Sequence, residues 1–168
     1  MMAQAKPRFA LRPYLPQDAP VLADIYRASI EELTEDDYSP AQQEAWAAAA
    51  EDLASFARRL GRHLALIATH EGRPVGFITL DSPTEIGLFH VHPAVARQGV
   101  GAMLYDAVEK LAASRGAPHL SVDASDTAHR FFARRGFIAE QRNTATVGNE
   151  WLSTTTMRKK LAGRERTP

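Results

Sequence analysis

The sequence of 168 residues contains no cysteine, which excludes disulfide bonds, thiolate metal sites and cysteine nucleophiles. Lys and Arg together number 20, as do Asp and Glu, so the formal net charge is +0. The broad basic surface typical of nucleic-acid binding is therefore absent. No apolar run approaches the length of a membrane span, and the N-terminal residues lack the apolar stretch of a signal peptide. We expect no nucleic-acid partner, no membrane partner and a cytoplasmic location.

Apolar residues make up 45% of the sequence and charged residues 24%, as in soluble globular proteins. The length fits one domain. We expect a single domain over residues 1–168, with its core at about 8–161 and a basic, disordered tail at 162–168. Charge is uneven within this domain, because residues 28–57 contain eight acidic side chains and neither Lys nor Arg.

The spacing of apolar residues predicts helices first, then strands, then alternating strands and helices, which is a mixed α+β layout with one core. One helix start is clear, because Ser39 stands before Pro40 and three residues before Gln42. Helices are predicted at residues 18–30, 39–50, 52–60, 99–115 and 127–135. Strands are predicted at residues 9–11, 63–69, 75–80, 85–91, 120–122, from 137, and at 151–161.

The most informative segment runs from a buried strand through Pro93 to Gly99-Val100-Gly101 at the start of a helix. Free N–H groups at a helix start attract anions, and the helix dipole adds to the attraction. Glycines allow a diphosphate to approach the backbone closely, and Arg97 can add charge-assisted contacts. Alone, however, Gly-x-Gly also fits a helix start that merely needs flexibility.

Two other phosphate-binding motifs fit poorly. A P-loop ends in Gly-Lys-Ser/Thr, whereas Gly101 is followed by Ala102 and Met103. A dinucleotide-binding turn has a third glycine where this sequence has Leu104.

Together with its surroundings, the segment resembles the acetyl-CoA signature of the GNAT N-acetyltransferase superfamily. The matching residues are Val91-His92-Pro93, five further residues, and Gly99-Val100-Gly101-Ala102-x-Leu104. A second match downstream is Ser125-x-x-Ala128-x-x-Phe131-Phe132-x-x-x-Gly136-Phe137, and a third, Asp37-Tyr38-Ser39-Pro40-x-Gln42-x-x-Ala45-Trp46, is similar to a bacterial, uncharacterised branch. The resemblance runs from about residue 8 to residue 161.

The resemblance implies a mixed, mostly antiparallel twisted sheet of about six to seven strands, flanked by about four helices. Its fourth and fifth strands would splay apart, and the pantetheine arm of acetyl-CoA would lie in the gap. An open strand edge offers unused donors and acceptors to such an amide-rich ligand. The residues implied to bind acetyl-CoA are Phe89, His90, Val91, Arg97, Gln98, Gly99, Val100, Gly101, Ala102, Ser125, Phe131, Phe132 and Arg134.

Three positions depart from the family pattern. The family usually has Gln or Arg where this sequence has Ala96, but the backbone of the turn can still bind phosphate. The family often has Tyr where this sequence has Phe132, and that Tyr protonates the leaving thiolate. Ser125 likewise replaces a common Asn. Either another acid serves or none is needed, and Tyr26, Tyr38 and Tyr105 are the alternatives.

A general base is expected, because an amine of pKa about 10.4 arrives protonated at neutral pH. Glu85 lies six residues before Val91, where the resemblance places a catalytic glutamate in histone-acetylating members. His90 is the alternative, as it titrates near neutrality. His90 and His92 share one face of a strand, but no third ligand is evident nearby, so we expect no metal.

Glu31, Asp37 and Tyr38 belong to the region that covers the acceptor site in the family, and an acidic rim would attract a cationic amine. The predicted function is therefore acetyl transfer from acetyl-CoA to a primary amine, carried by a small molecule or a peptide. Alternatives are a non-catalytic acyl-CoA-binding regulatory domain and transfer to a protein or an aminoacyl-tRNA. A homodimer is frequent in the family.

Overall fold

The protein is described by a computed structural model over residues 8–161, so the predicted tail at 162–168 lies outside the described residues. Five α-helices are present in this range: α1 (Ala19–Leu33), α2 (Pro40–Ala47), α3 (Leu53–Leu60), α4 (Val100–Ser114) and α5 (His129–Arg134). The strands are β1 (Phe9–Pro13), β2 (Leu64–His70), β3 (Arg73–Ser82), β4 (Glu85–Val91), β5 (His119–Ser125), β6 (Ile138–Val147) and β7 (Glu150–Lys160).

The strands form one seven-stranded sheet in the order β1-β2-β3-β4-β5-β7-β6. All neighbouring pairs are antiparallel except β4 and β5, which are parallel. This confirms the predicted mixed, mostly antiparallel sheet. The resemblance implied about four helices, and the described range holds five.

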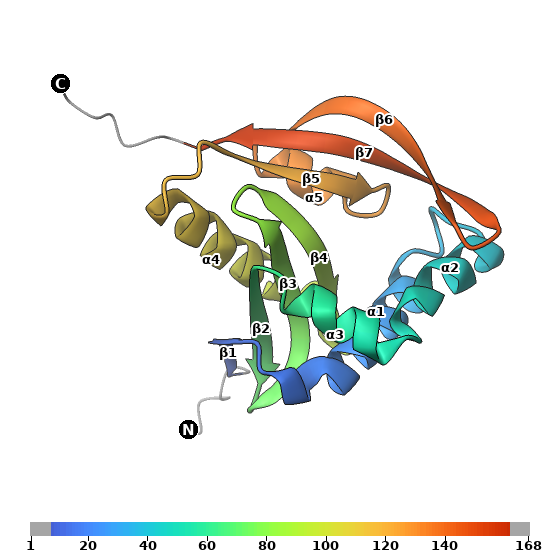
Figure 1. The fold of residues 1–168 in the computed structure, drawn as a ribbon, viewed down its shortest axis with the longest axis horizontal. Coiled ribbons are helices and arrows are strands. Elements are labelled where there is room, and N and C mark those ends of the chain that lie inside the picture. Colours follow the sequence, from blue (N-terminus) through green and yellow to red (C-terminus); the bar gives the residue numbers. More distant parts are fainter. Residues whose placement is uncertain (1–7, 162–168) are drawn as a thin grey trace, which may run out of the picture.

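The parallel pair separates soon after it begins. Within residues 8–161, β4 and β5 pair at Glu85 with Ser121 and at Ile86 with Val122, and their remaining residues do not pair. In Figure 1, β4 turns away from β5 and β7, so the sheet opens on the side where α1 and α2 lie. The predicted splay of the fourth and fifth strands is therefore present, and it leaves backbone groups of β4 without a strand partner.

Two apolar cores hold the helices on opposite faces of the sheet. On one face, α4 packs through residues such as Leu104 and Val108, and α5 through Phe132. On the other face, α1 and α3 pack against Ile67, Phe77 and Leu88. The gap between β4 and β5 therefore lies between one layer of helices, α1 and α3, and a second layer, α4 and α5.

Local sequence signals explain most element boundaries. The side chain of Ser39 accepts a hydrogen bond from Gln42 N at 3.2 Å, and the Gln42 side chain accepts one from Ser39 N at 2.9 Å, so α2 begins with the predicted capping box. Strand β6 begins close to the predicted start at residue 137 and runs to Val147, an end that the sequence did not indicate. It is an edge strand with mostly exposed side chains, so its sequence lacks the apolar alternation of a buried strand.

Candidate active site

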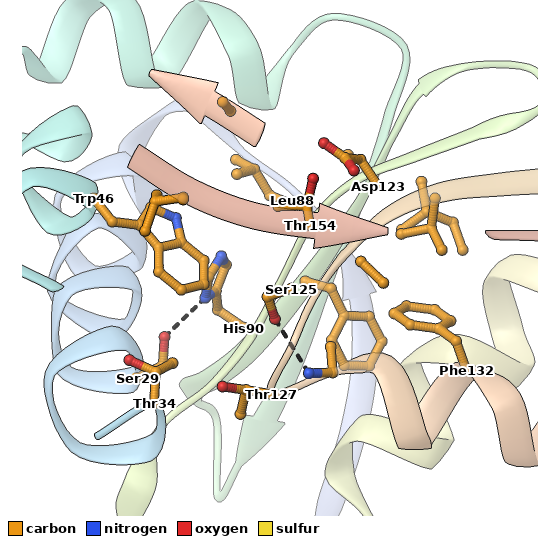
Figure 2. Close-up of a pocket in the computed structure, with 18 of the residues that line it drawn as sticks. Ser29, Thr34, Trp46, Leu88, His90, Asp123, Ser125, Thr127, Phe132 and Thr154 are labelled. Carbon is orange, nitrogen blue, oxygen red and sulfur yellow. Dashed lines mark hydrogen bonds between the residues drawn. The ribbon is translucent and has the colours of Figure 1, made fainter. Parts of the chain in front are cut away.

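A cavity of about 790 Å³ lies where β4 and β5 diverge. Figure 2 shows Ser29, Trp46 and His90 gathered at one end and Phe132 at the other, with Ser125 between them. We call these ends the α1 side (Ser29, Trp46, His90 and their neighbours) and the α5 side (Ser125, Phe131, Phe132 and their neighbours). The cavity therefore connects the two helical layers through the gap between the strands.

The predicted anion-binding turn has an unusual backbone. Arg97 and Gly99 have φ angles of 64° and 85°, on either side of Gln98. A positive φ is uncommon for a residue with a Cβ and costs on the order of 1–3 kcal/mol. Backbone turns of this kind direct successive N–H groups toward one side and form anion-binding concavities.

The N–H groups of this turn are free. Within residues 8–161, no oxygen of the chain accepts a hydrogen bond from the main-chain nitrogens of residues 97–102. Three of these residues, Val100, Gly101 and Ala102, form the first turn of α4, where N–H groups have no intrahelical partner. The turn can therefore bind an anion with main-chain donors at the positive end of a 15-residue helix.

The turn adjoins the α5 side of the cavity. A Cβ at Gly101 would lie 3.4 Å from the Phe89 ring and 3.8 Å from the Phe131 ring, and both rings line the cavity. Phe89 packs on Phe131 and Phe132 with centroid separations of 5.3 and 5.9 Å. Aromatic packing thus joins β4 to α4 and α5 around one end of the splay.

The remaining residues predicted to bind acetyl-CoA occupy different positions around this end. Val91 lines the cavity at the end of β4. Ser125 accepts a hydrogen bond from Ala128 N at 3.1 Å and so supports the turn before α5. Phe132 is only 1% exposed, whereas Arg134 is exposed in the last turn of α5.

His90 lies on the α1 side, and its neighbours include one polar and three aromatic side chains, one of them Phe77 at 5.7 Å between ring centroids. Its Nδ1 is 2.8 Å from Ser29 Oγ, and its ring lies 4.6 Å from the Tyr26 ring and 6.2 Å from the Trp46 ring, centroid to centroid. The Ser29 hydroxyl also lies 2.9 Å from the Tyr26 carbonyl, and in the tautomer that satisfies both contacts His90 Nδ1 donates to Ser29 and His90 Nε2 carries a lone pair.

Burial among these rings lowers the pKa of His90 to about 3. The sequence-based expectation that His90 titrates near neutrality therefore differs from the structure, and the cause is desolvation of the charged ring. His90 is a hydrogen-bond acceptor at neutral pH and a weak base. His92 also makes a hydrogen bond within the chain, because its Nδ1 accepts one from Ala94 N at 3.0 Å.

Glu85 is the first residue of β4, and its side chain is exposed at the rim of the cavity. The register pairs it with Ser82 of β3 and with Ser121 of β5, where the two strands are still joined. It therefore stands at the point from which the splay opens, with access both to the cavity and to solvent.

Of the three residues predicted to bind the acceptor, Tyr38 lines the cavity, whereas Glu31 and Asp37 are exposed outside its lining. The Tyr38 hydroxyl donates to Ser153 O at 2.7 Å and accepts from Asp126 N at 2.8 Å. Burial raises the pKa of Tyr38. These bonds join the α1–α2 loop to β7 and to the loop after β5, so Tyr38 holds the cavity wall in place.

The other two tyrosines considered as acids are buried. Tyr26 lines the cavity, donates from its hydroxyl to Trp46 O at 3.2 Å, and burial raises its pKa to about 12. The Tyr105 hydroxyl is buried without a hydrogen-bond partner in the described part of the chain, and Tyr105 does not line the cavity. Tyr105 is therefore a core residue beneath α5.

Sequence reasoning missed three charged residues of the cavity lining: Arg59 of α3, Asp81 of β3 and Asp123 of β5. The signal for Asp81 was Gly87, because a glycine inside a strand often marks a close approach of another group. A Cβ at Gly87 would lie 2.2–2.4 Å from the Asp81 carboxylate. Nothing in the local sequence of α3 distinguishes Arg59 from the other arginines of that segment.

Comparisons with known proteins agree with this architecture. The model of the acetyltransferase (GNAT) domain family matches residues 34–161. The uncharacterized N-acetyltransferase YafP of Escherichia coli K12 is 30% identical over 150 residues, which cover 89% of this chain and 95% of YafP. The chain therefore belongs to the GNAT family and is an acyltransferase of the GNAT type.

Solved structures of the same class superpose on most of the chain. A GCN5-related N-acetyltransferase from Rhodopseudomonas palustris is 56% identical, with a TM-score of 0.89 over 96% of this chain and 99% of that chain. The PaiA N-acetyltransferase of Thermoplasma acidophilum, solved with coenzyme A, shares the fold at 19% identity, with a TM-score of 0.75 over 92% of this chain and 99% of that chain. In the described range, no helix is long and apolar enough to span a bilayer.

Proposed function

We propose that this protein transfers the acetyl group of acetyl-CoA directly to a primary amine, without a covalent enzyme intermediate. The observation that carries the proposal is the row of free main-chain N–H groups at residues 97–102, next to a cavity that opens along an unpaired strand edge. A diphosphate satisfies such donors, and an amide-rich arm can pair with β4 beyond the point where β5 departs.

The two ends of the cavity have different roles in this proposal. The turn around Gly99 holds the phosphates, and Phe89, Phe131 and Phe132 exclude water where the coenzyme supplies its thioester. His90 Nε2 offers an acceptor to the incoming amine. Glu85 at the rim passes the released proton to solvent.

Calorimetric titration with acetyl-CoA tests the phosphate site. Gly99→Glu places an acidic side chain on the turn and forces a residue with a Cβ into a φ of 85°, so we expect acetyl-CoA binding to be lost. Gly116→Glu is the matched control, because Gly116 has a φ of 83° and open space around it at the other end of α4. Equal loss in both variants, or full affinity in Gly99→Glu, would contradict the assignment.

A thiol-release assay over a panel of primary amines tests the reaction. We expect turnover in the wild type and reduced turnover with unchanged acetyl-CoA affinity in Glu85→Gln. Tight acetyl-CoA binding without turnover on any small-molecule, peptide, protein or aminoacyl-tRNA amine would instead favour an acyl-CoA-binding regulatory domain.

A further inference from the structure

An ion pair of opposite charges lies in the lining of the cavity, on the face of the sheet covered by α1 and α3. Arg59 Nη2 is 3.4 Å from Asp81 Oδ2, and both residues line the cavity. The Asp81 side chain is 15% exposed and the Arg59 side chain 43%. The family signature quoted above does not include either residue.

Asp81 is held in a prepared position. Thr79, which is fully buried, donates from its hydroxyl to Asp81 Oδ1 at 3.2 Å and accepts the N–H of Leu88 at 2.8 Å. The β3–β4 register is irregular on both sides of Leu80, which lets a side-chain hydroxyl replace a main-chain partner here. Gly87 leaves the space that the Asp81 carboxylate occupies. The carboxylate is thus held against the middle of β4 by Thr79, which also binds Leu88 N, and by the space at Gly87.

The pair retains hydrogen-bonding capacity. A contact of 3.4 Å between single atoms is long for a charge-assisted hydrogen bond, and it is the one bond that the Arg59 guanidinium makes within residues 8–161. A guanidinium has five N–H donors and a carboxylate has about four acceptor positions. A ligand that brings an ammonium group to Asp81 and a carboxylate to Arg59 would use the remaining acceptor positions of Asp81 and the remaining donors of Arg59.

We propose that Asp81 and Arg59 recognise the acceptor, and that the acceptor is a free α-amino acid with an apolar side chain. This inference rests on the proposed acetyl transfer and names its substrate class. The ammonium group of the amino acid lies against Asp81 and its carboxylate against Arg59. The side chain lies against apolar residues of the cavity lining, among them Leu33 and Trp46.

Other classes of amine complement the pair less well. A polyamine would bring a second positive charge toward Arg59 without a carboxylate to bind it. A peptide N-terminus has an amide where Arg59 would meet a carboxylate. An amine without any anionic group leaves the guanidinium with its long contact to Asp81 alone.

Asp81 also gives the reaction a proton acceptor close to the nucleophile. The ammonium group transfers one proton to Asp81, the amine nitrogen bonds to the acetyl carbon, and the carbon–sulfur bond breaks. The second proton of the nitrogen ends on the coenzyme sulfur, and the proton on Asp81 leaves to solvent by way of Glu85. The ammonium form of the amino acid and the thioester thereby yield an N-acetyl amino acid, free coenzyme A and one released proton.

Steady-state kinetics with three related amines test the proposal: phenylalanine, phenylalanine amide and 2-phenylethylamine. We expect kcat/KM for phenylalanine to exceed that for either analogue about 10- to 100-fold, because both analogues leave the guanidinium without its charged partner. Arg59→Gln should lower kcat/KM for phenylalanine by a similar factor and leave 2-phenylethylamine nearly unchanged. Arg58→Gln, which removes the same charge from the exposed side of α3, should behave like the wild type.

Asp81→Asn should reduce turnover of all three amines while acetyl-CoA affinity in calorimetry stays the same. Thermal melts of each variant show whether the fold persists. If the analogues lacking a carboxylate react as well as phenylalanine in wild type and Arg59→Gln alike, the substrate class is wrong and acetyl transfer still stands. If acetyl-CoA does not bind to the wild type, the proposed function itself fails.

Discussion

The two ends of the cavity are built from different parts of the chain and by different means. The α5 side relies on main-chain N–H groups of residues 97–102 and on the packed rings of Phe89, Phe131 and Phe132. The α1 side relies on polar side chains from four elements, with Ser29 on α1, Arg59 on α3, Asp81 on β3 and His90 on β4. Main-chain donors do not depend on side-chain identity, so they suit a coenzyme that is the same in every reaction. Side chains can differ between proteins that act on different acceptors.

The largest effect expected from a single substitution falls on the α5 side. Phe132 is 1% exposed and packs against Phe89, Phe131, Tyr105 and Phe137. Phe132→Ala should lower the free energy of unfolding by about 3–5 kcal/mol and weaken acetyl-CoA binding, because it leaves a cavity under α5. Urea unfolding gives the stability change. A loss below about 1 kcal/mol would show that this end is less tightly packed than the distances indicate.

Gly87→Ala should damage the α1 side alone. The new methyl group would meet the Asp81 carboxylate at 2.2–2.4 Å, so the carboxylate must leave its position. We expect turnover to fall about 100-fold, an effect of about 2.7 kcal/mol on the barrier, with unchanged acetyl-CoA affinity. Gly61→Ala is the control, as its nearest neighbour would be 3.7 Å away. Parallel loss of acetyl-CoA affinity would mean that the two ends are not independent.

Stability should fall in acid through His90. Its pKa is about 3 in the folded chain and about 6.5 in the unfolded chain, so below pH 6.5 the unfolded state binds the proton more readily. This contribution destabilises the fold progressively between pH 6.5 and about 3, by up to about 2 kcal/mol at pH 5. Urea midpoints at pH 7 and pH 5 should shift less in His90→Gln than in the wild type. An equal shift in the wild type and in His90→Gln would show that His90 does not cause the loss of stability in acid.

The smallest effect is expected at Arg134, which is exposed at the end of α5. If it contacts a coenzyme phosphate, Arg134→Gln should weaken acetyl-CoA binding by about two- to fivefold at low salt, since exposed ion pairs contribute about 0–1 kcal/mol. The difference from the wild type should shrink at high salt because of screening. Calorimetry at two salt concentrations measures it, and an effect independent of salt would rule out an electrostatic contact.

Prediction from sequence succeeded where the signal is local. The capping box at Ser39 and Gln42 and the glycines at 99 and 101 act on neighbouring backbone, so their spacing along the chain carries the information. The extent of β6 was not predictable, because an exposed edge strand has no apolar alternation to reveal it. The low pKa of His90 was not predictable either, since its desolvation comes from α1 and α2 residues distant in sequence.

The sequence by itself determined the order of elements, the glycine-containing turn before α4 and the family to which the chain belongs. These follow from short motifs whose residues interact within a few positions of one another. Only the tertiary structure decided that Arg59 meets Asp81, that Gly87 makes room for the carboxylate, and that His90 is neutral in the cavity. Those relations depend on how helices pack on a twisted sheet, because packing brings together residues that no sequence spacing connects.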